Sequence, residues 1–300
     1  LQLAAEISPE AIAPHYYLGL AFEKLKEYSH AMQETQIVLK LDAAHKPSQL
    51  LLVRLLTQTG KLGEADSYLK KLKINYPNST VLLELEGRIA MAENRFSDAI
   101  RHFKEAIKSQ KKGKSTLIIL LATAQIRTND IELGYKTLGN WLERNPTDIL
   151  VRKTYADLLL INGVIEQAQS HYNEIVLFQP NNASAHNNLA WILTQEKNMR
   201  EALIHAQKAY EIAPNNSKIL DTLVMILLQT KQTEKAKQLL QKAITKEPNG
   251  INIRFHLARV LAKMGDTKEA IRILKELLDQ YPDHSKNQQA KKLLKELESQ

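Results

Sequence analysis

The chain has 300 residues, of which 44% are hydrophobic and 25% charged, and its formal net charge is +8 at pH 7. It contains no cysteine, which excludes a disulfide scaffold, a zinc ribbon and a thiol nucleophile. The longest apolar runs, Leu117–Ala122 and Leu223–Leu228, are far shorter than the roughly 20 residues that span a bilayer. Leu1–Glu6 lacks the basic segment of a signal peptide. We therefore expect no direct membrane insertion by this segment.

Regularly spaced prolines reveal an internal repeat. Pro146, Pro180, Pro214, Pro248 and Pro282 follow one another at intervals of 34 residues. Pro77 lies 69 residues before Pro146, and Pro9 lies 68 residues before Pro77, so the period extends over the chain with one inserted residue. With this proline at repeat position 32, the sequence divides into eight units: 12–45, 46–79, 80–114, 115–148, 149–182, 183–216, 217–250 and 251–284.

In chain order, residues 1–11 match the end of a truncated preceding repeat, because Ala4 and Pro9 fall at positions 27 and 32. Each unit then predicts two helices whose backbones approach closely, since position 20 of the second helix is always small. The residues at this position are Ala31, Ala65, Ala99, Gly134, Ala168, Ala202, Ala236 and Ala270. Position 8 of the first helix is also small or branched, and position 27 is apolar.

Turn and cap residues mark the helix ends. Position 15 holds residues that suit the turn between paired helices: Gly60, Asn94, Asn129, Gly163 and Gly265. The proline at position 32 is expected to end the second helix, because it cannot donate to the carbonyl four residues back. Position 34 supplies expected N-caps for the next unit: Ser79, Asp148, Asn182 and Asn216.

Two segments depart from the period. Unit 80–114 carries one extra residue and the run Gln110–Lys114 in place of its proline, so a looser turn is expected there. Residues 285–300 are strongly polar with a narrow apolar stripe formed by Ala290, Leu293, Leu294 and Leu297. This pattern predicts a C-terminal capping helix, which a stacked array needs in order to cover its last apolar face.

The repeat resembles the tetratricopeptide repeat (TPR), and the resemblance covers essentially the whole chain. The small residues at positions 8 and 20 and the proline at position 32 distinguish it from the 35-residue helical repeats that read RNA. The resemblance implies an all-α fold, a right-handed α-solenoid superhelix of eight stacked TPR helix pairs plus a C-terminal cap helix. It also implies a concave groove, lined by positions 2, 5, 9, 12 and 13 of the first helices, that takes a protein or peptide ligand.

Catalytic and metal-binding patterns are missing from the sequence. The nine histidines are never closer than 15 residues, so a helical His-x-x-x-His pair is excluded, and no phosphate-binding or nucleophile motif occurs. His102, His171 and His205 all fall at position 23, which we interpret as a surface position of the repeat. We expect no enzymatic activity, no catalytic residue, no cofactor and no metal.

The positive charge does not predict a nucleic-acid site. Net positive charge is concentrated in units 46–79, 80–114 and 217–250, with no continuous stripe and no interleaved aromatic platform. Lys111, Lys112 and Lys114 fall in a loop between repeats, where a solvated cluster is expected. We therefore expect no nucleic-acid partner.

The later units place large apolar side chains at the groove positions. These are Leu160, Ile161, Trp191, Met225, Leu228 and Phe255. One interpretation is an apolar groove for a peptide or helix, with Trp191 as its anchor. The other is that some of these side chains pack against neighbouring first helices within a tight superhelix. The polar residues Asn187 and Asn188 complete the predicted site with Lys153 and Asp157.

Some TPR domains hold a terminal carboxylate of a peptide with basic residues and asparagines at fixed groove positions. The corresponding residues here are Lys153, Asp157, Asn188, Lys218 and Thr222. Asp157 would repel an incoming carboxylate and is expected to pair with Lys153, which lies one turn earlier on the same helix. The groove is therefore not expected to bind acidic C-terminal tails, and its contacts are expected to be apolar and amide-mediated.

A narrower resemblance lies in three successive segments, Asn187–Trp191 (NNLAW), Asp221–Met225 (DTLVM) and Phe255–Arg259 (FHLAR). They are similar to the N-N-L-A-W, D-T-L-G-W and H-L-A motifs of TPR-repeat lipoproteins of the PEP-CTERM/exosortase system, with departures at Val224 and Met225. This resemblance implies the C-terminal part of a longer, exported array with a lipid anchor upstream of residue 1. Its setting would be the periplasm or the outer membrane of a Gram-negative envelope, in exopolysaccharide and protein-sorting machinery.

Two other functions agree with the same residues. One is a cytoplasmic adaptor that recognises a peptide through its groove. The other is the TPR arm of a larger enzyme, whose catalytic domain would lie beyond either end. The primary expectation is a non-catalytic protein–protein interaction scaffold.

Overall fold

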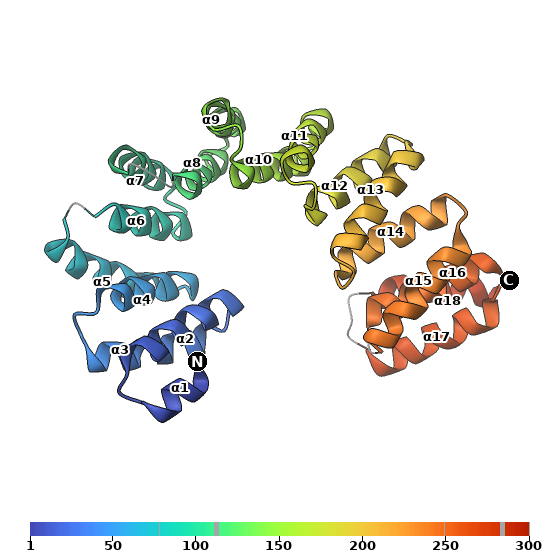
Figure 1. The fold of residues 1–300 in the computed structure, drawn as a ribbon, viewed down its shortest axis with the longest axis horizontal. Coiled ribbons are helices and arrows are strands. Elements are labelled where there is room, and N and C mark those ends of the chain that lie inside the picture. Colours follow the sequence, from blue (N-terminus) through green and yellow to red (C-terminus); the bar gives the residue numbers. More distant parts are fainter. Residues whose placement is uncertain (78, 111–113, 249, 283–285, 300) are drawn as a thin grey trace. The chain divides into compact units, whose positions relative to one another are not determined.

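A computed structural model describes residues 1–77, 79–110, 114–248, 250–282 and 286–299 (Figure 1). Within these residues the regular secondary structure is 18 α-helices, without strands. The chain forms two compact units, Leu1–Val151 and Arg152–Gln300, and their boundary falls within α10 (Ile149–Ile161). The expected all-α solenoid of stacked helix pairs is confirmed, whereas the division into two compact units was not expected from the period.

The first compact unit contains nine complete helices. They are α1 (Gln2–Ile7), α2 (Ile12–Leu25), α3 (Tyr28–Leu41), α4 (Lys46–Gln58), α5 (Leu62–Asn75), α6 (Thr80–Ala92), α7 (Phe96–Ser109), α8 (Ser115–Arg127) and α9 (Ile131–Arg144). The second compact unit continues from α10 with α11 (Ile165–Phe178), α12 (Ala183–Gln195), α13 (Met199–Ile212), α14 (Ser217–Gln229), α15 (Thr233–Lys246), α16 (Ile251–Met264), α17 (Thr267–Gln280) and α18 (Asn287–Glu298). From α2 to α17, each repeat unit expected from the sequence contains one helix pair.

The prolines end the second helices as expected. The helices α5, α9, α11, α13, α15 and α17 each end two residues before the proline at position 32. The side chains of Asn182 and Asn216 accept backbone N–H groups at the start of α12 and α14, and Asp148 accepts the N–H of Val151 at 3.2 Å. Ser79 is the N-cap of α6 but makes no capping hydrogen bond with its side chain. The residues 111–113, where a looser turn and a solvated lysine cluster were expected, lie outside the described residues.

A left-handed residue joins the helices of every pair. The expected turn residues all have positive φ, from 59° at Asn94 to 88° at Gly265. The three units without Gly or Asn at this position use a lysine instead: Lys26, Lys197 and Lys231, with φ of 63°, 62° and 58°. Because a non-glycine residue pays a steric penalty in this conformation, the tight turn is imposed by the packing of the helix pair.

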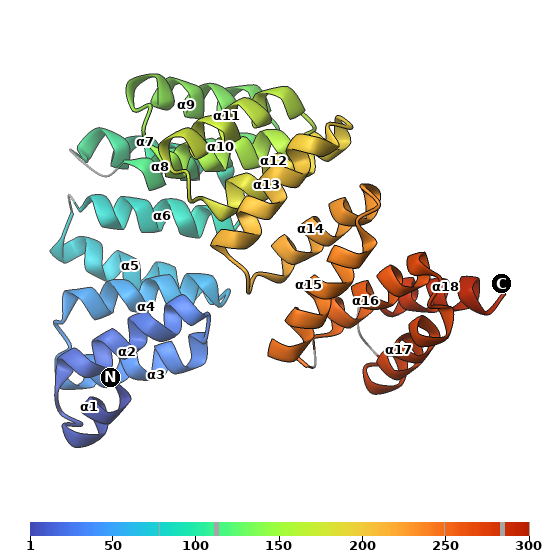
Figure 2. The same cartoon turned by 45° about the vertical axis from the view of Figure 1, so that its right-hand side comes forward.

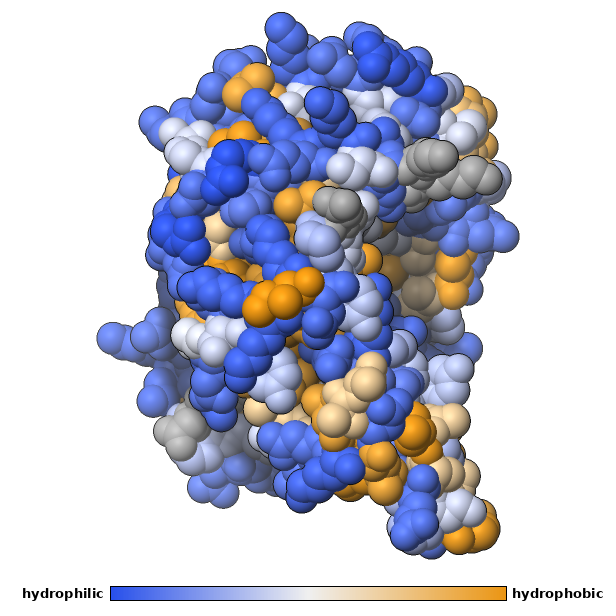
Figure 3. Space-filling view, turned by 90° about the vertical axis from the view of Figure 1, so that its left-hand side faces the viewer, coloured by the Kyte–Doolittle hydropathy of each residue, from blue (hydrophilic) through white to orange (hydrophobic). Residues whose placement is uncertain are grey.

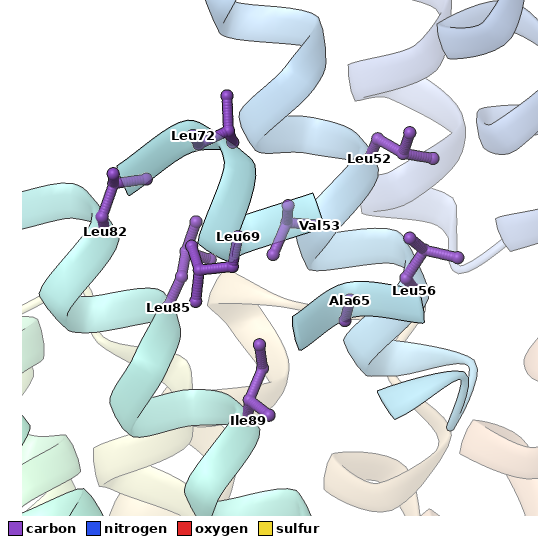
Figure 4. Packing of buried hydrophobic residues seen from close by; sticks show 9 residues of the cluster. All are labelled: Leu52, Val53, Leu56, Ala65, Leu69, Leu72, Leu82, Leu85 and Ile89. Atoms are coloured by element: carbon purple, nitrogen blue, oxygen red, sulfur yellow. The ribbon is translucent and has the colours of Figure 1, made fainter. Parts of the chain in front are cut away.

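Small residues allow the two helices of a pair to come close. Positions 8 and 20 are buried in all eight units. Cores between neighbouring pairs are then filled by leucine and isoleucine. In the first compact unit, nine buried hydrophobic residues from α4, α5 and α6, most of them leucine, form one cluster (Figure 4). They are Leu52, Val53, Leu56, Ala65, Leu69, Leu72, Leu82, Leu85 and Ile89. Each pair thus completes its core with the first helix of the next.

The first helices of successive pairs also touch one another. In the first compact unit α2 contacts α4 and α4 contacts α6, and in the second α12 contacts α14 and α14 contacts α16. Each second helix packs between its own first helix and the next one, as α13 does between α12 and α14. The helices α12, α14 and α16 therefore share one side in the second compact unit, and a hydrogen bond from Asn188 to Asp157 joins α10 to it. We call this side the first-helix face.

The C-terminal helix was expected to cover the end of the stack. In the described residues, α18 packs against α17 and α16, and its Ala290 and Leu297 are buried. The Asn287 amide donates hydrogen bonds to the carbonyl oxygens of Tyr281 and Pro282, both at 2.6 Å. These two bonds anchor the start of α18 to the end of α17.

Candidate functional site

The predicted groove residues belong to the second compact unit, on its first-helix face. Repeat position 9 places Asp157 on α10, Trp191 on α12, Met225 on α14 and Arg259 on α16. These helices follow one another along the unit (Figure 2). Because the four residues occupy the same position in successive units, they form one row across the face.

The α10 end of the row is a closed polar cluster around Asp157. Its carboxylate accepts from Lys153 Nζ at 2.5 Å, from the Tyr172 hydroxyl at 2.6 Å and from Asn188 Nδ2 at 3.5 Å. Burial of the phenol and the nearby carboxylate raise the pKa of Tyr172 above its ordinary value. The expected pairing of Lys153 with Asp157 is present, so this carboxylate is already compensated within the protein.

Trp191 lies at the centre of the row with 44% of its surface exposed. The core side of α12 is formed by other residues, Leu189, Ala190 and Ile192, which are fully buried. On the preceding first helix, Ile161 is 80% exposed and Leu160 is half-buried. These three large side chains are thus accessible on the face, and for them the open-groove interpretation agrees with the structure.

Two predicted groove residues are instead part of the packing. Leu228 is 4% exposed and Phe255 is 3% exposed, so neither can contact a partner in this conformation. The Phe255 ring lies among Arg259, Lys286 and His256, where the approach of α16 and α18 covers it. The groove assignment was wrong for these two residues, because the sequence pattern does not show how closely the last first helices approach.

Met225 is half-buried between the accessible and the covered parts of the row. Its sulfur atom lies 3.0 Å from Nη1 of Arg259, one repeat further along. Burial lowers the pKa of Arg259 below its ordinary value, which the charge of Asp221 partly opposes. Arg259 was not among the predicted site residues, and the signal that could have identified it is its place at position 9.

The two asparagines of the predicted site have different surroundings. Asn188 donates to Asp157, as described. The side-chain oxygen of Asn187 is buried and has no hydrogen-bond partner among the described residues. A buried amide oxygen without a partner is costly.

The position-23 histidines are not simple surface residues. Two of them face position 4 of the first helix in the same pair: His205 Nδ1 lies 2.9 Å from His186 Nδ1, and His171 Nδ1 lies 3.3 Å from an Arg152 nitrogen. His102 Nδ1 lies 3.4 Å from Glu86 Oε2. Burial lowers the pKa of His205, of His171 and of His102. The expectation of a surface position is corrected, since these imidazoles fill the space between paired helices.

Position 4 also contacts the preceding repeat. His186 Nε2 donates to the carbonyl oxygen of Pro180 at 3.0 Å, and His15 makes the same bond to Pro9 at 3.0 Å. Arg254 Nε likewise donates to Pro248 at 3.0 Å. The proline thus ends the second helix of one repeat, and its carbonyl group accepts a hydrogen bond from the side chain at position 4 of the next repeat. This contact was not foreseen in the sequence.

The described residues offer neither a group of metal ligands nor a membrane-spanning helix. There, the acidic and histidine side chains form no group of three or more that could hold a metal ion. The same residues include no helix that combines the length and the apolar character needed to cross a membrane. On the side of the molecule seen in Figure 3, hydrophobic residues form small separate patches on a mainly polar surface.

Family models match most of the chain in sections. A tetratricopeptide-repeat model matches residues 193–250 and 227–297, and a second one matches residues 156–217. A model described as Iml2/tetratricopeptide repeat protein 39 matches residues 35–121. No protein with a curated description matches the chain in sequence.

Solved structures share the fold at low identity. The C-terminal part of a TPR-repeat protein from Cytophaga hutchinsonii is 16% identical with a TM-score of 0.59, and the match covers 80% of this chain and 98% of that one. A chain of the APC/C Cut9–Hcn1 hetero-tetramer is 17% identical with a TM-score of 0.52 over 90% of this chain. This chain spans about half, 52%, of that relative. A MamA double mutant is 20% identical with a TM-score of 0.50, and the match covers 58% of this chain and 99% of that one.

The repeat period, the helix pairs and the family matches all agree. The proline spacing predicts the observed helix ends, and the small positions are buried in every unit. The matched models are themselves repeat models that span both compact units. The chain is therefore a tetratricopeptide-repeat protein.

Proposed function

We propose that this chain is a non-catalytic protein-binding scaffold, and that a peptide or helix of its partner binds the first-helix face of the second compact unit. The observation that carries this proposal is the exposure of Trp191, 44% of whose surface is accessible on a helix with a well-packed core side. A large aromatic residue in such a position gives up much apolar surface when a partner covers it. Tryptophan is also enriched among the residues that dominate binding energy at interfaces.

The surroundings of Trp191 favour a ligand bound by apolar and amide contacts. Ile161 and Leu160 supply accessible apolar surface on the preceding first helix. The side-chain oxygen of Asn187 is buried without a partner among the described residues, so a backbone N–H of a peptide reaches it only if this amide rotates towards the face. Asp157 contributes little net charge, because Lys153 and Tyr172 already donate to it.

The experiment is a selection of displayed peptides against the whole 300-residue chain, followed by affinity measurement on variants. We expect Trp191→Ala to weaken the selected peptides by about 30-fold, the equivalent of about 2 kcal/mol. Leu177→Ala is the matched control, because Leu177 is 75% exposed but lies on the second helix α11. Equal binding to wild type and Trp191→Ala would contradict the proposed site.

We also propose the envelope setting, which rests on the resemblance of Asn187–Trp191, Asp221–Met225 and Phe255–Arg259 to motifs of PEP-CTERM/exosortase TPR lipoproteins. The protein would then serve exopolysaccharide and protein-sorting machinery from the periplasm or the outer membrane, with a lipid anchor upstream of residue 1. Fractionation of the source cells tests this directly. Recovery in the membrane or periplasmic fraction is expected, whereas recovery in the cytoplasm would favour the adaptor alternative.

A further inference from the structure

In the part of the chain that the structure describes, Arg259 is a cation on the first-helix face without a carboxylate partner. Among the described residues, no aspartate or glutamate oxygen lies within ion-pair distance of its guanidinium, whereas Lys153 on the same face is paired with Asp157. The hydrogen-bond acceptor next to Arg259 is the Met225 sulfur atom, at 3.0 Å from Nη1. A thioether is a weak acceptor, so this contact leaves most of the donor capacity of the guanidinium for a ligand.

The environment of Arg259 makes an external carboxylate favourable. The guanidinium is partly desolvated, and burial lowers its pKa. Asp221, whose charge partly opposes the lowering of this pKa, lies 3.0 Å from His256 Nε2. A partly buried cation without a partner gains more from a carboxylate than an exposed cation does.

The row therefore has chemically different ends. Asp157 is neutralised at the α10 end by Lys153, the centre is apolar at Trp191 and Met225, and the α16 end carries the positive charge of Arg259. A ligand that matches this row has a large apolar side chain at Trp191 and an acidic side chain at Arg259. The helices set the separation between the two contacts.

Two helix spacings separate Trp191 from Arg259, because α12 packs on α14 and α14 packs on α16. Packed helices lie about 8–10 Å apart, so the two side chains start from axes about 16–20 Å apart. An extended peptide advances about 3.3 Å per residue and would cover that distance in about five or six residues.

We propose that the partner segment is an extended acidic peptide, in which an aspartate or glutamate that binds Arg259 lies five or six residues from a large apolar residue that binds Trp191. This inference rests on the proposed function and specifies the ligand of the same face. It concerns a side-chain carboxylate at α16, which is distinct from the terminal carboxylate that the residues around Asp157 disfavour.

The test uses a library of random 12-residue peptides displayed without a free C-terminus and selected on the whole chain. Peptides selected on wild type are expected to carry an acidic residue five or six positions from an apolar one. Selection on Arg259→Glu is expected to replace that acidic residue by lysine or arginine. Lys268→Glu is the matched control, since Lys268 is exposed on the second helix α17. This substitution makes the same change of charge at a place away from the first-helix face. Its selected peptides should keep the acidic residue.

A synthetic copy of one selected peptide, amidated at its C-terminus, then gives the affinities. Exchanging its acidic residue for the amide is expected to weaken binding to wild type at least tenfold and to have no effect on Arg259→Gln, whose fold is checked by circular dichroism. Peptides that depend on Trp191 but show no acidic preference would overturn this inference and leave the proposed function intact. If no peptide is selected, or if binding ignores Trp191, the proposed function fails and this inference fails with it. An affinity that needs the free terminal carboxylate would also overturn the inference.

Discussion

The ring of Phe103 occupies the space that a side chain on Gly87 would need. A Cβ atom on Gly87 would lie 2.3 Å from Cε1 of Phe103, far inside van der Waals contact. The two residues face each other across the pair α6 and α7, and both are buried. Glycine at this position is thus explained by a specific aromatic neighbour on the other helix of the pair.

Gly87→Ala is expected to destabilise the first compact unit. The added methyl group must displace the Phe103 ring, and overpacking of this kind costs about 1–3 kcal/mol, which outweighs the roughly 1 kcal/mol that alanine gains over glycine in a helix. Urea denaturation followed by circular dichroism gives the midpoint. Gly63→Ala is the matched control, because a Cβ there meets no atom within 4 Å. An unchanged midpoint for Gly87→Ala would refute the packing argument, and Gly87→Ala combined with Phe103→Leu should recover stability.

Gly163→Ala is expected to lower the melting temperature for a different reason. Gly163 has φ of +76° in the turn between α10 and α11, where an added side chain meets no atom within 4 Å. Alanine in this left-handed conformation costs about 1–2 kcal/mol through its own backbone sterics. Gly163→Asn should lower the melting temperature less than Gly163→Ala does, because asparagine tolerates the left-handed conformation better than alanine. Equal melting temperatures for wild type and Gly163→Ala would contradict the assignment of strain to the turn.

Stability is expected to fall as the pH drops below about 6.5. Burial and then His186 lower the pKa of His205 from its ordinary value of 6.5, and burial does the same for His171. As the pH falls, the unfolded chain therefore binds these protons first. The stabilisation is complete above pH 6.5, decreases below it and levels off once the pH is below the folded-state pKa.

Thermal melts between pH 8 and pH 5 measure this effect. His205→Gln should reduce the loss of stability at low pH, since it removes one of the histidines whose pKa is lowered in the folded protein. His30→Gln is the control, because the His30 side chain is 60% exposed. Identical pH profiles for wild type and His205→Gln would contradict the prediction.

Trp191→Ala is expected to change the free energy of unfolding by no more than about 1 kcal/mol, because removal of the exposed ring opens no large cavity. Leu189→Ala on the same helix should instead cost about 2–5 kcal/mol, as expected for a fully buried leucine. Chemical denaturation of both variants makes the comparison. A loss at Trp191 equal to that at Leu189 would place the tryptophan in the core.

The helix pairs could be predicted because their requirements are local. Pro180 ends its helix through its own missing N–H group, and Ala168 lets two helices approach because its own side chain is small. Both effects depend on the residue itself, so they can be recognised within a single repeat. The lysine turns at Lys197 and Lys231 were missed, since lysine has no preference for positive φ and takes it only because the packed helices require it.

The candidate site was predicted only in part because exposure depends on neighbouring helices. Trp191 and Phe255 both fall at groove positions, yet one is 44% exposed and the other 3%. Phe255 lies on α16, against which α18 packs, and Lys286 at the start of α18 lies 5.8 Å from its ring. The division of the chain within α10 was likewise invisible, because that helix follows the same period as the others.

The hydrogen bond from position 4 to the preceding proline has a consequence for cutting this protein into shorter pieces. A fragment that begins at the first residue of α12 would lose the Pro180 carbonyl group, and His186 Nε2 would lose its acceptor. A fragment that begins four residues earlier, at Gln179, would keep both groups. The natural module for recombination is therefore a segment that runs from one proline to the next, offset from the helix pair itself.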